Sequence, residues 1–327
     1  MERAPSAIST GQFESWCSYL RVTACIMVVS LHSTGPWMHH YAVDTINWVI
    51  GDLVNALCRV CVPFFLMLSG YLIGGRNQSL MVYAKKRIDR VLPAFLGATA
   101  LALLYRAATG EQMQLVNLVS WLWTPQYFHL DFFYALAIIY TAFAFWRPAA
   151  LNPIVGAAIA LISVIAFGYI ISSVVPFGGP SRVCYYLGYL SFAFGGYYAG
   201  QIRTKPSTAR WLAAAGIACL IGTGAFVYRD SLRIGAIDET FYNYCSPLIA
   251  LGSFLLFTSA RHLFPNHAPS AVAKLLDRTS LTIYCVHPFI LAALFKAVDV
   301  WRVTPILAIP AVVAFTVMLI VSLSSSR

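Results

Sequence analysis

The stretch LRVTACIMVVSLHSTGPW, residues 20–37, carries an arginine and a histidine inside an otherwise apolar run. The run approaches the ~20 residues that a helix needs to cross the hydrocarbon core of a bilayer. Arg21 and His32 are eleven residues apart, about three helical turns, so both lie on one face, roughly 16 Å apart along the axis. Membrane spans rarely hold ionisable side chains without a function. This face therefore predicts a reaction channel.

The composition indicates a membrane protein. The chain has 327 residues, of which 59% are hydrophobic and 10% are charged, and its mean hydropathy is +0.72. About a quarter of the residues are charged in soluble domains, so an ordinary soluble domain is excluded. We predict an all-α polytopic integral membrane protein in contact with membrane lipids. The net charge of +10 indicates loop charges that fix the topology, and no nucleic-acid partner is expected.

Apolar runs predict about ten transmembrane helices, with a short cytoplasmic tail at 1–15 and a single membrane domain over 16–327. Lys and Arg concentrate on the segments that face the cytoplasm if the N-terminus is inside, which predicts that both termini are cytoplasmic. Gly196-x-x-x-Gly200 predicts the close approach of a neighbouring helix. The predicted spans are 16–37, 53–73, 91–108, 130–147, 152–175, 183–200, 211–228, 243–261, 279–298 and 304–323.

The eight cysteines lie mostly inside apolar runs. Cys58-x-x-Cys61 has the spacing of a redox or zinc pair, but no second pair or ligand set accompanies it. We therefore interpret these two as small core residues and predict no metal site. The sequence does not decide whether Cys184 and Cys245 form a disulfide, because both are expected near the outer side.

Three residues are candidates for catalysis: His32, Arg21 and Arg59. His32 lies in the outer half of its predicted span, where a neutral imidazole can accept a proton; the alternative is a histidine hydrogen-bonded between helices. Arg21 is predicted to be an ionic anchor at the cytoplasmic end of this face. The alternative is an arginine whose side chain extends to the inner membrane surface. Arg59 is predicted at a depth similar to that of His32, and Pro63 leaves its carbonyl without a helical donor. The alternative is a kinked helix whose arginine reaches outer water.

The segment YAKKRIDRVLP at 83–93 is a candidate site for the phosphates of a donor. Arg87 and Arg90 share a face if the segment is helical, and guanidinium groups bind phosphate oxygens bidentately. Lys85 and Lys86 lie beside them. The alternative is a basic loop that only sets topology. No Walker or dinucleotide-binding motif is present.

The remaining candidates, for substrate binding, are His129, Asp131, Ser69 and His287. His129 and Asp131 open the predicted fourth span, where the carboxylate also suits the helix dipole. His287 precedes a proline in the ninth span, and its alternative role is a hydrogen bond between helices. Ser69 is either a nucleophile or a hydroxyl bonded to its own helix.

Taken in order, several segments resemble the membrane-bound acyltransferase 3 family. The blocks that carry the resemblance are Leu20-Arg21 with His32, VPFFLMLSGYL at 62–72, Arg87-x-x-Arg90 before Leu-Pro, FHLDFFYALAIIY at 128–140 and SLTIYCVHPF at 280–289. The block spacing, YFHLDFFYAL and DETFYNYCSPL at 238–248 look most like the branch that O-acetylates enterobacterial common antigen.

The resemblance implies an O-acetyltransferase of the bacterial inner membrane. It implies transfer from acetyl-CoA to a hydroxyl of a lipid-linked or polymeric saccharide. The family's arginine–histidine pair maps to Arg21 and His32, and its CoA-linked arginine pair maps to Arg87 and Arg90. Asp131 departs from the family, which often has Trp at this place. We expect the thioester to pass Arg21 on its way from the cytoplasm to His32; no oligomeric state is predicted.

Two other classes stay open. A proton-coupled transporter, or a carrier that moves acyl groups across the inner membrane, also uses intramembrane Arg and His with Pro-broken spans. Such carriers usually show internal two-fold repetition, and we find none in this sequence. The third class is a membrane receptor or scaffold without chemistry.

Overall fold

The protein is described from a computed structural model, which covers residues 15–75, 78–110, 125–146, 148–175, 179–264 and 267–325. Almost all of the predicted N-terminal tail, 1–15, therefore lies outside the described residues. The described part is helical and contains no strand.

The longer helices are α1 (Ser15–His40), α2 (Ile46–Cys58), α3 (Cys61–Gly74), α4 (Leu80–Ala108), α5 (Asp131–Phe145), α6 (Pro153–Ile165), α8 (Gly179–Ala199), α9 (Pro206–Ile234), α10 (Pro247–Leu263), α11 (Ala271–Ala297) and α12 (Pro305–Ser325). The short segments are η3 (Phe128–Leu130), a π-helical turn η4 (Ala166–Ile171), α7 (Ser172–Val174), η5 (Thr240–Tyr242) and η6 (Val300–Arg302).

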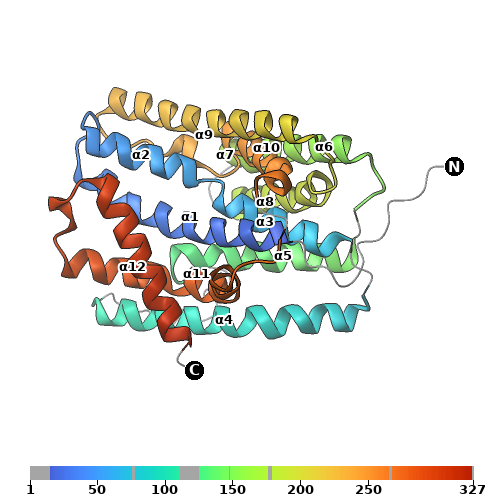
Figure 1. The fold of residues 1–327 in the computed structure, drawn as a ribbon, viewed down its shortest axis with the longest axis horizontal. Helices are drawn as coiled ribbons and strands as arrows, with labels where there is room; N and C mark the ends of the chain where they lie inside the picture. Colours follow the sequence, from blue (N-terminus) through green and yellow to red (C-terminus); the bar gives the residue numbers. More distant parts are fainter. Residues whose placement is uncertain are drawn as a thin grey trace.

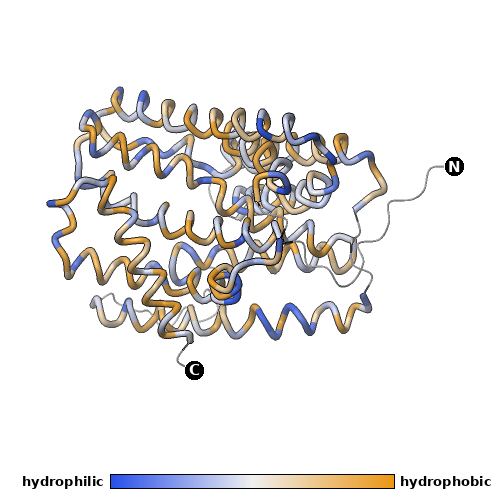
Figure 2. Tube along the Cα trace, viewed as in Figure 1, coloured by the Kyte–Doolittle hydropathy of each residue, from blue (hydrophilic) through white to orange (hydrophobic). Residues whose placement is uncertain are grey.

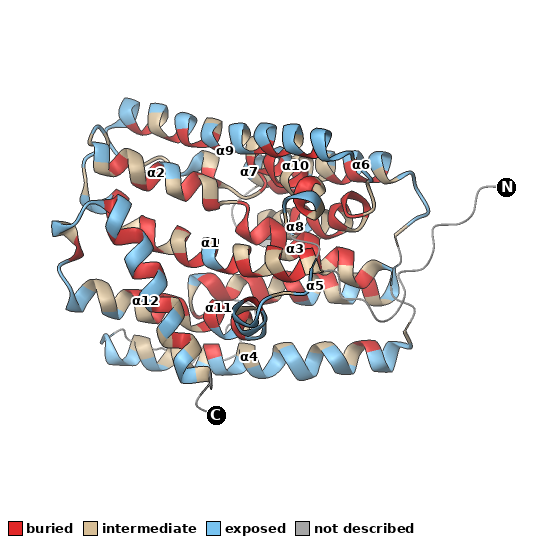
Figure 3. Ribbon diagram, viewed as in Figure 1, coloured by how far each residue is buried: buried red, intermediate tan, exposed pale blue. Residues whose placement is uncertain are grey.

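Helix α1 runs through the middle of the bundle, with α2 and α9 on one side and α4 on the other (Figure 1). It packs against α2, α3, α11 and α12. Helix α4 is peripheral: most of its residues are exposed, and its buried residues are Tyr83, Ala98 and Ala102 (Figure 3).

The chain is a polytopic membrane protein. Within the described ranges, eight helical stretches are long and apolar enough to cross a bilayer. The other two predicted spans, 16–37 and 183–200, form the helices α1 and α8. Apolar side chains such as Leu96, Trp211 and Ile306 are exposed on the outside, and apolar residues recur along the outer helices (Figure 2). Lipid, not water, suits such a surface.

The structure adds local detail at three places in the predicted spans and the basic segment. The predicted span 53–73 lies within one apolar stretch, Ile46–Gly74, in which Arg59 and Val60 separate α2 from α3. Pro63 is the third residue of α3, where its missing N–H costs no hydrogen bond. Helix α1 continues through Pro36 to His40, three residues beyond the predicted end of the first span. The basic segment at 85–90 lies inside α4 and is not a loop.

Small residues bring α3 and α8 into contact, as the sequence predicted. A Cβ placed on Gly196 would lie 2.1 Å from the carbonyl oxygen of Met67. A Cβ on Gly70 would lie 1.7 Å from the carbonyl oxygen of Ala193. Because both obstacles are backbone atoms, only glycine permits this spacing. This contact fixes α3, which carries part of the site.

All eight cysteines are free thiols. Cys245 is buried and Cys184 is partly exposed, and no disulfide joins them. Cys58 and Cys61 are buried core residues, as interpreted from the sequence.

Gly196→Ala should lower stability by about 1–3 kcal/mol, because the backbones of α3 and α8 must separate to admit the methyl group. Thermal unfolding of the purified protein in detergent measures the change. Gly97→Ala is the matched control, since nothing lies within 4 Å of a Cβ placed there. That variant should be neutral or stabilised by less than about 1 kcal/mol. Equal melting temperatures for the two variants would refute the packing argument.

Candidate active site

Two cavities of different chemical character lie inside the bundle. We call the first, of about 580 Å³, the arginine cavity, because basic side chains from α1, α4 and α11 line it. We call the second, of about 380 Å³, the histidine cavity, because His32 and His129 line it together with Arg59. The basic residues of the arginine cavity are Arg21, Lys86, Arg87, Arg90 and Arg278.

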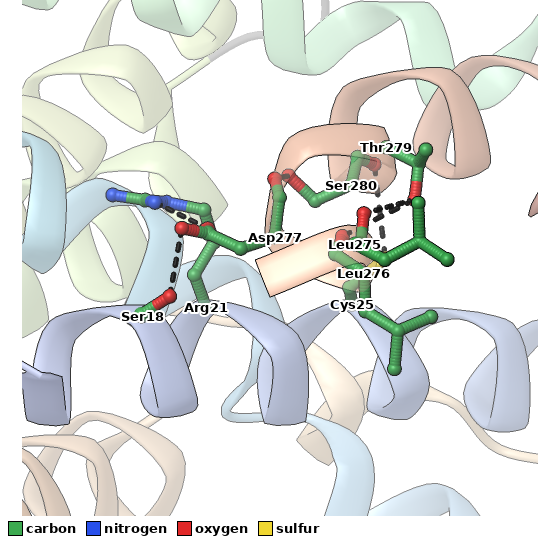
Figure 4. Close-up of polar contacts among 8 residues, drawn as sticks. All are labelled: Ser18, Arg21, Cys25, Leu275, Leu276, Asp277, Thr279 and Ser280. Atoms are coloured by element: carbon green, nitrogen blue, oxygen red, sulfur yellow. Dashed lines mark hydrogen bonds and ion pairs between the residues drawn. The ribbon is translucent and has the colours of Figure 1, made fainter. Parts of the chain in front are cut away.

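A carboxylate far along the chain neutralises Arg21. Its guanidinium forms an ion pair with Asp277 of α11, and Ser18 Oγ donates a hydrogen bond of 2.7 Å to the same carboxylate (Figure 4). The sequence prediction missed Asp277. The signal was an acidic residue in LLDRTSLTIY, just before the ninth predicted span, since a carboxylate beside an apolar run needs a partner.

The basic face of α4 contributes three of its four predicted residues to the arginine cavity, namely Lys86, Arg87 and Arg90. The helix places the two arginines on one face, as the spacing predicted. The guanidinium carbon of Arg87 lies 3.9 Å from the ring centroid of Tyr83. Lys85 is not in the cavity lining; its exposed ammonium lies 3.5 Å from Asp89.

Ser69 lines the arginine cavity, but its hydroxyl is engaged locally. Its Oγ donates a hydrogen bond of 2.8 Å to the carbonyl oxygen of Phe65, four residues earlier. This is the bond to its own helix that the sequence left open as the alternative to a nucleophile.

His32 belongs to a cluster of rings from three parts of the chain. Its ring centroid is 4.9 Å from that of Phe128 and 5.2 Å from that of His287. It lines the histidine cavity and forms no hydrogen bond with a described residue. A neutral imidazole in this position keeps a nitrogen lone pair that is available to a ligand.

The other two histidines are each fixed in one tautomer by backbone carbonyls. His129 Nε2 donates to Cys285 O at 3.2 Å, and His287 Nδ1 donates to Ile283 O at 3.0 Å. The second nitrogen of each ring, His129 Nδ1 and His287 Nε2, is then an acceptor. Both atoms are buried without a partner among the described residues. Of these two, His129 lines the histidine cavity and offers an acceptor for a hydroxyl proton there, whereas His287 lines neither cavity.

A buried polar chain orients Arg59. Its Nε donates to Asn55 Oδ1 at 2.8 Å, and its guanidinium carbon lies 4.2 Å from the ring centroid of Tyr242. The Tyr242 hydroxyl in turn donates to the carboxylate of Asp52. Sequence reasoning missed Asp52 and Asn55, although two polar residues one turn apart in an apolar helix are a signal of a buried network.

Asp131 lines the histidine cavity and also begins α5. The hydroxyl of Tyr186 donates to its Oδ1 at 2.5 Å. Its negative charge lies in the first turn of α5, where it is favourable to the helix dipole, as the sequence allowed. Its carboxylate also lines the cavity beside tyrosines of α8. Tyr185, Tyr189 and Tyr244 complete this aromatic lining.

Three aromatic side chains stand between the cavities: Phe65, Phe132 and Tyr284, which we call the aromatic wall. Phe132 and Tyr284 line both cavities, and Phe65 lines the arginine cavity. The ring centroids of Phe132 and Tyr284 are 5.0 Å apart. Arg21 and His32 thus line two different cavities that have Phe132 and Tyr284 in common, and the passage expected between them stays a prediction.

Comparison with known proteins gives one family. A family model described as an acyltransferase domain matches residues 14–325. Searches of curated proteins and of solved structures find no significant match to the chain.

Asp277→Asn should destabilise the protein by about 2–3 kcal/mol, because it leaves the charge of Arg21 without its carboxylate in a poorly hydrated place. We place the cost at the low end for buried pairs because the two side chains are 14% and 17% exposed. Thermal or denaturant unfolding in detergent measures it. The same exchange at Asp89, whose pair with Lys85 is exposed, should change stability by less than about 0.5 kcal/mol. An equal effect at both positions would contradict the assignment.

Proposed function

This chain belongs to the acyltransferase 3 family, and we propose that it is an O-acetyltransferase that moves an acetyl group from acetyl-CoA to a hydroxyl of a cell-envelope saccharide. The observation that carries the proposal is the pairing of a cationic cavity with an imidazole cavity on the two sides of one aromatic wall. The first suits the phosphates of a donor and the second suits a hydroxyl that must lose a proton.

The donor binds in the arginine cavity. The phosphates of CoA contact Lys86, Arg87 and Arg90, since cations with several N–H donors bind phosphate oxygens strongly. Arg21 is held by Asp277 and lies deeper along the same path. The pantetheine arm extends along this lining and brings the thioester to the aromatic wall. With the N-terminus and the basic N-terminal part of α4 on the cytoplasmic side, acetyl-CoA enters from the cytoplasm of a bacterial inner membrane.

The acceptor binds in the histidine cavity. Its tyrosines offer flat faces for sugar rings, and His129 and Asp131 offer hydrogen-bond acceptors for sugar hydroxyls. The resemblance to the enterobacterial common antigen branch makes a lipid-linked saccharide of that type the first acceptor to test. His287, stacked on His32, holds the imidazole in place.

The transfer is direct in this proposal. His32 takes the proton of the acceptor hydroxyl while its oxygen attacks the thioester carbonyl carbon. Arg59 stabilises the oxyanion. The C–O bond forms, the C–S bond breaks, and the proton passes from His32 to the leaving CoA thiolate. The local hydrogen bond of Ser69 favours this route over a covalent serine intermediate.

The deciding experiment combines purified protein, labelled acetyl-CoA and a lipid-linked saccharide in liposomes. Label in the saccharide selects the acetyltransferase. Movement of the saccharide or of an acetyl group across the liposome without acetylation selects a carrier and overturns the proposal.

His32→Ala should lower kcat by about 10²–10⁴-fold, because general base catalysis contributes that factor. The rate of label transfer measures it, and melting temperature checks the fold. His39→Ala is the matched control: it removes an exposed histidine of the same helix and should leave kcat unchanged. Wild-type turnover in His32→Ala would remove this residue from the mechanism.

Arg87→Ala and Arg90→Ala should each raise the KM for acetyl-CoA by about tenfold or more, since a hydrogen bond to a charged group is worth about 1.5–3 kcal/mol. Initial rates over a range of acetyl-CoA concentrations test this. Lys85→Ala, outside the cavity on the same helix, should keep the wild-type KM. If all three variants keep the wild-type KM for acetyl-CoA, the basic residues of α4 have only a topological role.

A further inference from the structure

The aromatic wall lies between the cavities of the two proposed substrates. Phe132 of α5 and Tyr284 of α11 are the residues whose side chains face both cavities. They are 8% and 6% exposed, so neighbouring side chains leave them little freedom. An acyl group that moves from the arginine cavity to a hydroxyl beside His32 must come against these two rings.

The two rings are held in different ways. The Tyr284 hydroxyl donates a hydrogen bond of 2.6 Å to the carbonyl oxygen of His129, which ties α11 to η3. The Phe132 side chain has no hydrogen-bonding group, and its ring centroid lies 5.0 Å from that of Tyr284 and 5.9 Å from that of Phe65. Shortening Phe132 therefore opens the wall without breaking a hydrogen bond.

We infer that Phe132, packed against Tyr284, sets the largest acyl group that the protein can transfer. This rests on the proposed function, in which CoA occupies the arginine cavity and His32 activates the acceptor. The thioester is at the tip of the pantetheine arm, so the acyl group is the part of the donor that meets the wall. Packed interiors do not adjust freely to one added methylene, so each extra carbon must displace a ring. Of the acetyl, propionyl and butyryl groups, acetyl has the smallest volume and displaces the rings of Phe132 and Tyr284 least.

The test measures kcat/KM for acetyl-CoA, propionyl-CoA and butyryl-CoA with a lipid-linked saccharide as acceptor. Wild-type protein should prefer acetyl, since one methylene in a closely packed apolar pocket changes specificity by about 10–200-fold. Phe132→Ala should raise the propionyl-to-acetyl ratio by about tenfold or more. Phe132→Leu should raise this ratio by a smaller factor. If the alanine variant does not fold, the leucine variant provides the test.

Phe143→Ala is the matched control. Phe143 is a buried phenylalanine of the same helix, 7% exposed, that stacks on Phe194 and lines neither cavity. Its loss should leave the ratio of donors unchanged even if the protein becomes less stable. A purely structural role for Phe132 would lower all three rates together.

Two results would overturn the inference: a wild-type protein that transfers butyryl as readily as acetyl, or folded Phe132 variants with the wild-type ratio. Failure of the proposed function is distinct, because wild-type protein would then transfer no acyl group from any of the three donors.

Discussion

The ion pair between Arg21 and Asp277 is the constraint on which the site depends. It joins α1, the central helix, to α11, and Ser18 supplies a further hydrogen bond to the carboxylate. A charge placed in an apolar bundle is costly unless an opposite charge meets it. Both cavities are lined partly by α1 and α11, so the register of these two helices decides where His32 and Tyr284 stand.

A second constraint is the close contact of α3 and α8 through Gly70 and Gly196. It positions α3, whose other faces supply Phe65 and Ser69 to the arginine cavity. Helix α4 differs, because it is exposed along most of its length and presents its cations from the rim of the bundle. The protein thus combines a tightly packed centre around the aromatic wall with a loosely packed helix that carries the basic residues.

The separation of the cavities has a chemical consequence. Phe132 and Tyr284 line both cavities, so any route from the arginine cavity to the histidine cavity passes these two rings. In the proposed reaction, donor and acceptor approach these rings from different cavities. In the proposed reaction the site does two things. It holds His32 and Arg59 in the histidine cavity, and it limits which acyl groups can pass from the arginine cavity to the histidine cavity.

The sequence by itself determined the membrane fold and part of the site. Apolar runs of spanning length must become helices because hydrocarbon leaves backbone groups no other partner, and helical periodicity places Arg87 beside Arg90. Only the tertiary structure decided that Asp277 meets Arg21, that His287 stacks on His32, and that an aromatic wall interrupts the route. Periodicity fixes which residues share a face of one helix, but the packing of whole helices decides which faces meet.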